Sequence, residues 1–214
     1  MLRRLARRLS RKGKLAAKKS YDESNKMPEF SVEAPKVFSL RDPVDHQNVL
    51  DFIDDIFSNL RPKEKLRLDF SKTEGMFVDA ALVFMANLDK ALKYRPAEAL
   101  IKVAPAKLRP INAVLTQIGV LELCDQDFHI NPLEEGAADW LGFSGDSEEK
   151  FIPKDIYDYL EKAYKKPPPR LLFSAINEAL LNIKHHAYCD SESGTWWMLA
   201  KKSDDKFTIV VCDV

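Results

Sequence analysis

The sequence predicts an α/β (α+β) protein in which helices cover a mixed sheet and a smaller unit of helices and strands follows. Short apolar segments alternate with amphipathic segments of helical length over residues 28–132. An acidic stretch without periodicity, residues 133–153, separates this region from further helix and strand patterns in residues 154–214. The chain has 214 residues, of which 45% are hydrophobic and 31% charged, as in globular proteins with one large or two small domains.

The elements of the first region follow from the spacing of its apolar residues. Helices are expected where these residues recur every three or four positions, and strands where they alternate over shorter runs. A proline follows the first helix at Pro62, and Gly119 ends the third. Strands are expected at residues 30–40 (one or two), 66–70, 99–103 and 128–130, and helices at 45–60, 77–93 and 108–118.

The second region begins with the acidic linker, in which Trp140, Leu141 and Phe143 are expected only to touch a surface. After it, two helices are expected, separated by three prolines, and then two strands joined by a polar turn. The helices are placed at residues 154–165 and 169–188, and the strands at 195–200 and 207–212.

A basic arm, residues 1–27, precedes an acidic body. Residues 1–20 contain nine Lys or Arg and no acid, whereas residues 21–214 have a net charge of −9. Leu2, Leu5 and Leu9 share one helical face, so the arm could bind a polyanion, either anionic lipid or nucleic acid. It also has the composition of a mitochondrial transit peptide, and a solvated tail without a specific partner is the simplest alternative.

Several protein classes are disfavoured. No apolar run reaches the roughly 18 residues of a transmembrane helix, and no apolar stretch follows the basic arm as in a secretory signal. Cys124, Cys189 and Cys212 are far apart and odd in number, which suits neither a zinc site nor a disulfide framework. We therefore expect a cytoplasmic protein.

Two segments of the first region carry a family resemblance. They are KLRLDFSKTEGMFVDAALVFMANLDKAL, residues 65–92, and IKVAPAKLRPINAVLTQIGVLELC, residues 101–124. The order of elements in them resembles the STAS domain of anti-sigma-factor antagonists and sulfate transporters. The resemblance covers about residues 30–132 and implies that this region binds a protein partner.

One position departs from that family. Its phosphorylated members have Asp-Ser-Ser at the start of the helix, where this chain has Asp79-Ala80-Ala81. Alanine has no hydroxyl group, so we expect no phosphorylation there. Asp79 is then a helix N-terminal acid stabilised by the helix dipole, and Ser71 and Thr73 are the nearest loop hydroxyl groups.

The segment LLFSAINEALLNIKHHAY, residues 171–188, contains the strongest candidate site. Glu178, Asn182 and His186 are spaced four residues apart, which places them on one face of a helix about 6 Å apart in rise. An amide oxygen is a hard donor suited to Mg²⁺, and a carboxylate can orient or deprotonate a nucleophile in phosphoryl chemistry. An exposed polar stripe without function is the alternative.

The string Glu-x-x-x-Asn-x-x-x-His-Ala-Tyr resembles the N-box of anti-sigma-factor kinases and other histidine-kinase-like (GHKL, Bergerat-fold) ATPases. The later strand FTIVVCDV places Asp213 where that superfamily has its adenine-binding aspartate. The resemblance implies ATP and Mg²⁺ as cofactors, with Asn182 as the metal ligand and Glu178 as the catalytic carboxylate. It also implies that His186 lies near the phosphates and that Asp213 binds the adenine amino group.

Residues 154–214 would then be a partial ATPase domain, because the superfamily's glycine boxes are not among the 214 residues. Glycine-loop amides cradle phosphates, so we expect this chain alone to be inactive. The expected function is a regulatory ATP-binding protein with an in-cis STAS-like module, such as a partner-switching serine kinase of bacterial signalling. The alternatives are a non-enzymatic interaction module and an adaptor that binds nucleic acid through its arm.

Overall fold

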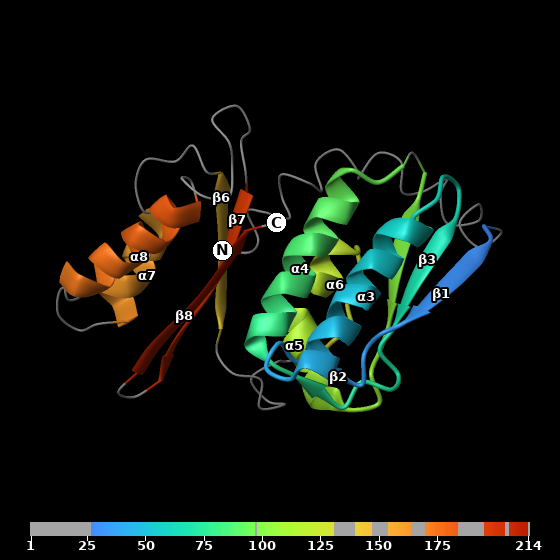
Figure 1. The fold of residues 1–214 in the computed structure, drawn as a ribbon, viewed down its shortest axis with the longest axis horizontal. Helices are drawn as coiled ribbons and strands as arrows, with labels where there is room; N and C mark the ends of the chain where they lie inside the picture. The colour runs from blue at the N-terminus through green and yellow to red at the C-terminus, as the bar shows by residue number, and fades with distance from the viewer. Residues whose placement is uncertain are drawn as a thin grey trace. The chain divides into compact units, whose positions relative to one another are not determined.

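The computed structural model describes residues 27–96, 98–130, 140–146, 154–163, 170–183, 195–203 and 206–213. These residues form two compact units, one before Trp140 and one from Trp140 onward, and each has its own sheet (Figure 1). Helices and several sheets occur together, which confirms the predicted α/β (α+β) class. Residues 1–26 of the basic arm lie outside the described residues.

The first unit contains the expected longer strands and helices in the expected order, together with a short strand at Gly75–Met76 and a short helix at Val120–Leu123 that were not expected. Helix bounds agree with the sequence patterns to within a few residues, whereas residues 128–130 are not a strand, so that prediction is wrong. In chain order the elements are β1 (Glu29–Glu33), β2 (Val37–Phe38), α3 (Pro43–Asn59), β3 (Lys65–Asp69), β4 (Gly75–Met76), α4 (Val78–Lys93), β5 (Leu100–Ala104), α5 (Arg109–Gln117) and α6 (Val120–Leu123).

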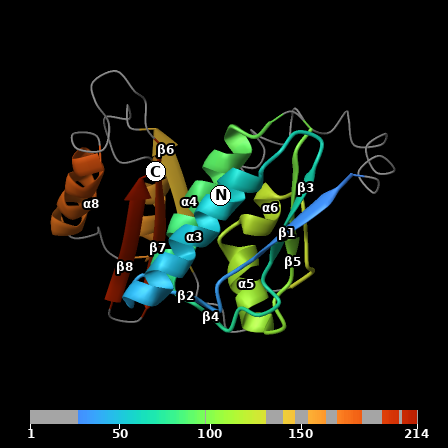
Figure 2. The same ribbon diagram turned by 45° about the vertical axis from the view of Figure 1, so that its right-hand side comes forward.

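The main sheet of the first unit is parallel, with strand order β1-β3-β5. The expectation of a mixed sheet is therefore corrected for this part of the chain. The reason lies in the connections: α3 separates β1 from β3 and α4 separates β3 from β5, and a helix crossover joins parallel neighbours. Two successive right-handed crossovers in one direction place both helices on the same face, as Figures 1 and 2 show.

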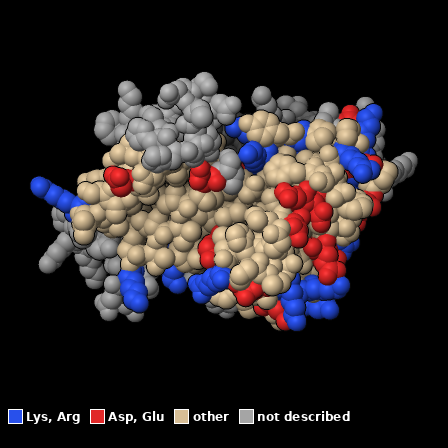
Figure 3. Space-filling view, viewed as in Figure 1, with Lys and Arg blue, Asp and Glu red and all other residues tan. Residues whose placement is uncertain are grey.

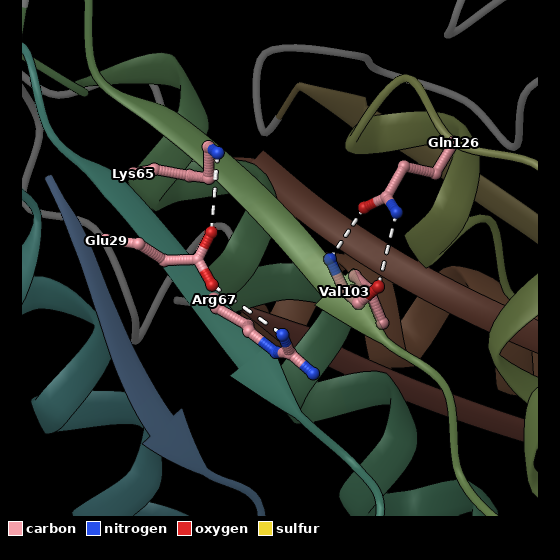
Figure 4. A network of polar contacts seen from close by, with 5 residues as sticks. All are labelled: Glu29, Lys65, Arg67, Val103 and Gln126. Atoms are coloured by element: carbon pink, nitrogen blue, oxygen red, sulfur yellow. Dashed lines mark hydrogen bonds and ion pairs between the residues drawn. The ribbon is translucent and has the colours of Figure 1, made fainter. Parts of the chain in front are cut away.

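The two faces of this sheet differ in chemistry because successive side chains alternate. In β3, Leu66 and Leu68 are buried beneath the helices, whereas Lys65 and Arg67 point to the opposite face. There the Glu29 carboxylate of β1 lies 3.3 Å from the Lys65 ammonium group and 3.6 Å from the Arg67 guanidinium group (Figure 4). The face away from the helices is thus polar, which is unusual for a parallel sheet.

Four phenylalanine rings form the centre of the first core. Phe38 from β2, Phe52 from α3, Phe70 after β3 and Phe84 from α4 are all almost fully buried. Their ring centroids lie 5.6 to 6.0 Å apart in every pair. These contacts fix α3 and α4 against the carboxyl end of β3.

Helix α3 begins with a conventional cap and presents an acidic outer face. The Asp42 carboxylate accepts the Val44 N–H at 2.9 Å, and Pro43 occupies the first turn. The helix contains four aspartates, at positions 45, 51, 54 and 55, and no lysine or arginine. Acidic atoms accordingly gather over this helix in the space-filling view (Figure 3).

The second unit is an antiparallel sheet of order β6-β7-β8 with two helices. Its elements are β6 (Leu141–Asp146), α7 (Lys154–Ala163), α8 (Arg170–Asn182), β7 (Thr195–Ser203) and β8 (Lys206–Asp213). Strand β6 lies within residues 133–153, so the interpretation of that whole stretch as a linker is wrong. The glycines and the serine of β6 interrupt the alternation of apolar and polar residues that marks a strand. Phe143 is nevertheless buried in the core of the unit.

The core of the second unit lies between its sheet and its helices. Trp196, Met198 and Ala200 of β7 pack with Ile156 and Leu160 of α7 and Ile176 of α8. The rings of Tyr157 and Phe173 stack at 5.1 Å and join the two helices. On the opposite face of β7, Trp197 and Leu199 are only 3% and 1% exposed, so both faces of this strand are buried.

Candidate functional site

Helix α8 divides into a buried side and an exposed side. Ile176 is buried in the core cluster, and Leu172, Leu180 and Ile183 pack against it. These positions recur at helical spacing, so one stripe of the helix faces the sheet. The glutamate and asparagine predicted to form the site lie off that stripe.

Glu178 and Asn182 are both exposed and one helical turn apart, as their spacing predicts. Their carboxylate and amide oxygens are hard donors of the kind that Mg²⁺ prefers, so their chemistry fits the predicted metal and phosphate roles. His186, the third member of the predicted face, lies outside the described residues.

Asp213 is the last residue of β8 and is exposed. Side chains two residues apart in a strand lie on the same face of the sheet, so Asp213 lies on the face of Phe207, Ile209 and Val211. These three residues pack against the core cluster beneath the helices. The side chain of Asp213 therefore lies on the sheet face that α8 covers. The structure thus brings α8 and Asp213 to one side of one sheet, within the same unit.

A pocket of about 730 Å³ lies in the first unit, at the carboxyl ends of β1, β3 and β5. Three lysines line it, Lys36, Lys72 and Lys107, together with Glu33 and Glu74. In the sequence, this loop is notable only for the hydroxyl groups of Ser71 and Thr73. The position could have been anticipated, because the carboxyl ends of parallel strands are a common place for ligand sites.

The hydroxyl groups of that loop serve the fold. Thr73 is 1% exposed, and its hydroxyl group donates to the Pro35 carbonyl at 2.9 Å. The Asp69 carboxylate accepts the Ser71 N–H at 2.9 Å, and this hydrogen bond lowers the pKa of Asp69 although partial burial opposes the shift. Both side chains thus hold the turn after β3.

The start of α4 has the character expected of a structural helix terminus. Asp79 lies in the first turn, where its carboxylate accepts the Ala80 N–H at 2.9 Å. Ala80 and Ala81 are fully buried. Their small side chains allow close packing, and neither could accept a phosphoryl group.

The described cysteines are unsuited to nucleophilic chemistry. Burial raises the pKa of Cys124 to about 12, and burial together with Asp213 raises the pKa of Cys212 to about 12. Both thiols are therefore protonated at neutral pH. Within the described ranges no group of three or more His, Cys, Asp or Glu could hold a metal ion, and no helix is long and apolar enough to cross a membrane.

Comparison of the chain with protein-family models, with curated proteins and with solved structures finds no match.

Proposed function

We propose that this chain is a regulatory adenine-nucleotide-binding protein of the histidine-kinase-like ATPase superfamily, with a STAS-like module in the same chain. In this proposal it acts in the cytoplasm as a partner-switching serine kinase or as a nucleotide-dependent regulator. The observation that carries the proposal is the position of Glu178, Asn182 and Asp213. Glu178 and Asn182 are exposed on α8, and Asp213 is exposed at the end of β8 on the sheet face that α8 covers.

Each residue has a distinct role in this proposal. The Asn182 amide oxygen binds Mg²⁺, and the Mg²⁺ ion neutralises phosphate charge. The Glu178 carboxylate orients or deprotonates the attacking group, and Asp213 accepts a hydrogen bond from the adenine amino group. His186, which lies outside the described residues, is four residues after Asn182 in the sequence, and its proposed role is to contact the phosphates.

Calorimetry with ATP and MgCl₂ tests these roles, because each of the three substitutions should change a different property of nucleotide binding or turnover. Asn182→Ala should remove the magnesium dependence of nucleotide binding. Asp213→Asn should weaken ATP binding relative to GTP by roughly ten- to a hundredfold, since a hydrogen bond to a charged group contributes about 1.5–3 kcal/mol. Glu178→Ala should preserve binding and lower turnover, because its role is in the chemical step.

Ser174→Ala is the matched control, because Ser174 is exposed on α8 one turn before Glu178. Binding by the 214-residue chain is expected to be weak, because it contains no Asp-x-Gly-x-Gly loop. If a longer form of this chain carries such loops, that form should bind more tightly. If it does not bind nucleotide, or if Asn182→Ala leaves the magnesium dependence unchanged, the nucleotide proposal is wrong.

The alternative is a non-enzymatic module in which the first unit binds a protein and the second is structural. One surface of the first unit supports it: Phe77 precedes α4 and is 40% exposed, with the Arg41 guanidinium group 4.7 Å from its ring centre. Exposed aromatic and arginine side chains are frequent in protein interfaces. Loss of partner binding in Phe77→Ala, with no nucleotide binding by this chain or by a longer form of it, would favour this alternative.

A further inference from the structure

The pocket at the carboxyl ends of β1, β3 and β5 is a feature that the nucleotide proposal does not use. Three segments form its walls: the residues after β1, the turn after β3, and the residues before α5. In a parallel sheet all strands end at the same edge, so these segments converge on one opening. The pocket therefore has the position of a ligand site.

The walls of the pocket are held by hydrogen bonds that point into the protein. The turn after β3 is fixed by the bonds of Asp69 and Thr73 described above. Before α5, the buried Asn112 carboxamide accepts the Ala106 N–H at 2.8 Å and donates to the Ala106 carbonyl at 2.9 Å. Both loops are thus fixed in place before any ligand binds.

The charged side chains that line the pocket are exposed to solvent, and three lysines stand against two glutamates. The Lys72 ammonium group lies 2.7 Å from the Glu33 carboxylate, and that of Lys36 lies 3.2 Å from Glu74. Each ammonium group has three N–H donors, so an ion pair with one carboxylate leaves donors for a second acceptor. Lys107 is exposed and forms no ion pair with another residue of the described ranges.

We propose that this pocket binds a small phosphate-bearing anion, with Lys107 as its principal cation and Lys36 and Lys72 beside it. Phosphate oxygens accept several hydrogen bonds at once, and lysine is a common phosphate-binding residue. A volume of about 730 Å³ accommodates a phosphate group together with an organic substituent. The site belongs to the first unit and does not depend on the nucleotide proposal.

The test is a titration of the full 214-residue chain with inorganic phosphate and, separately, with glycerol 3-phosphate, followed in ¹H–¹⁵N spectra. The amide signals of Lys72, Glu74, Lys107 and Leu108 should shift and saturate. Lys107→Ala should weaken binding by roughly ten- to a hundredfold, the loss expected for one charge-assisted hydrogen bond. Tighter binding of glycerol 3-phosphate would indicate an organic phosphate as the ligand, and equal binding would indicate phosphate itself.

Two controls separate this site from other cationic surfaces. Lys93→Ala removes an exposed lysine at the end of α4 and should leave the affinity unchanged. Asn182→Ala should also leave it unchanged, so failure of the nucleotide proposal would not affect the result. Shifts that never saturate, or an equal loss of affinity in Lys107→Ala and Lys93→Ala, would show only general attraction between phosphate and lysines and would overturn the proposal.

Discussion

At the scale of single residues, several polar side chains of the first unit hold backbone segments in place. Asp69, Thr73 and Asn112 each bond to the backbone of a loop at the carboxyl edge of the sheet. A buried or half-buried polar group needs such a partner, because removing it from water without one costs free energy. These side chains therefore hold the loops around the pocket against the rest of the first unit.

Asp69→Ala should lower the free energy of unfolding at neutral pH by about 1–3 kcal/mol, because the Ser71 N–H loses a charged acceptor. The pKa of Asp69 is lowered in the folded state from its ordinary value of 3.8. The carboxylate therefore stabilises the fold above that value, and its contribution is lost as the pH falls through the folded pKa. Urea unfolding of both proteins at pH 7 and pH 3 measures the change.

Asp54→Ala is the control for this prediction, because Asp54 is exposed on α3. Its effect should stay within about 0.5 kcal/mol at both pH values. A destabilisation by Asp69→Ala that is the same at pH 3 and pH 7 would show that the carboxylate charge is not its source.

At the scale of elements, periodicity predicted all the longer helices and most of the strands. It missed the short elements β4 and α6, which are too short to show a period. Two further errors have physical causes. Residues 128–130 alternate like a strand, but the preceding Gln126 occupies the edge of β5 where a further strand would pair. Its carboxamide accepts the Val103 N–H at 2.6 Å and donates to the Val103 carbonyl at 3.2 Å (Figure 4). Strand β6 was missed because its glycines give no apolar pattern, and only pairing with β7 defines it.

The positions of candidate site residues could be predicted from the sequence where those residues lie on one helix. The four-residue spacing placed Glu178 and Asn182 on one face of α8 without any tertiary information. The lysine pocket was not predicted, because its members come from three loops that only the parallel sheet brings together. Such long-range convergence has no local pattern in the sequence.

Gln126→Ala should lower the free energy of unfolding by about 1–3 kcal/mol, because it leaves the Val103 N–H and carbonyl at the sheet edge without the carboxamide. Hydrogen exchange of the Val103 amide should accelerate relative to that of Leu68 in the central strand. Gln47→Ala is the control, because the Gln47 carboxamide donates to the Asp51 carboxylate on an exposed helix surface. Unchanged exchange at Val103 would mean that other groups close this edge.

At the scale of the whole molecule, the chain contains two units with separate cores. The first core is built on phenylalanine rings contributed by strands and helices of the parallel unit. The second is built on tryptophan, methionine and aliphatic side chains of the antiparallel unit. Trp140, Trp196 and Trp197, the three tryptophans of the chain, all belong to the second unit.

Phe84→Ala should destabilise the first unit by about 3–5 kcal/mol, because it leaves a cavity among three other rings. Circular dichroism should show an earlier unfolding transition, while tryptophan fluorescence, which reports the second unit, should keep its midpoint. Phe57→Ala, at an exposed position of α3, should change neither signal appreciably. If both midpoints move together with Phe84→Ala, the two units unfold as one cooperative structure.

The contrast between β3 and β7 has a consequence for how the chain tolerates sequence change. In β3 only alternate residues are buried, so saturation mutagenesis should give a tolerance profile with a period of two, permissive at Lys65 and Arg67. In β7 five successive residues from Trp196 to Ala200 are buried. The same experiment should give an unbroken intolerant block there, and natural variants of this protein should drift far more slowly along β7 than along β3.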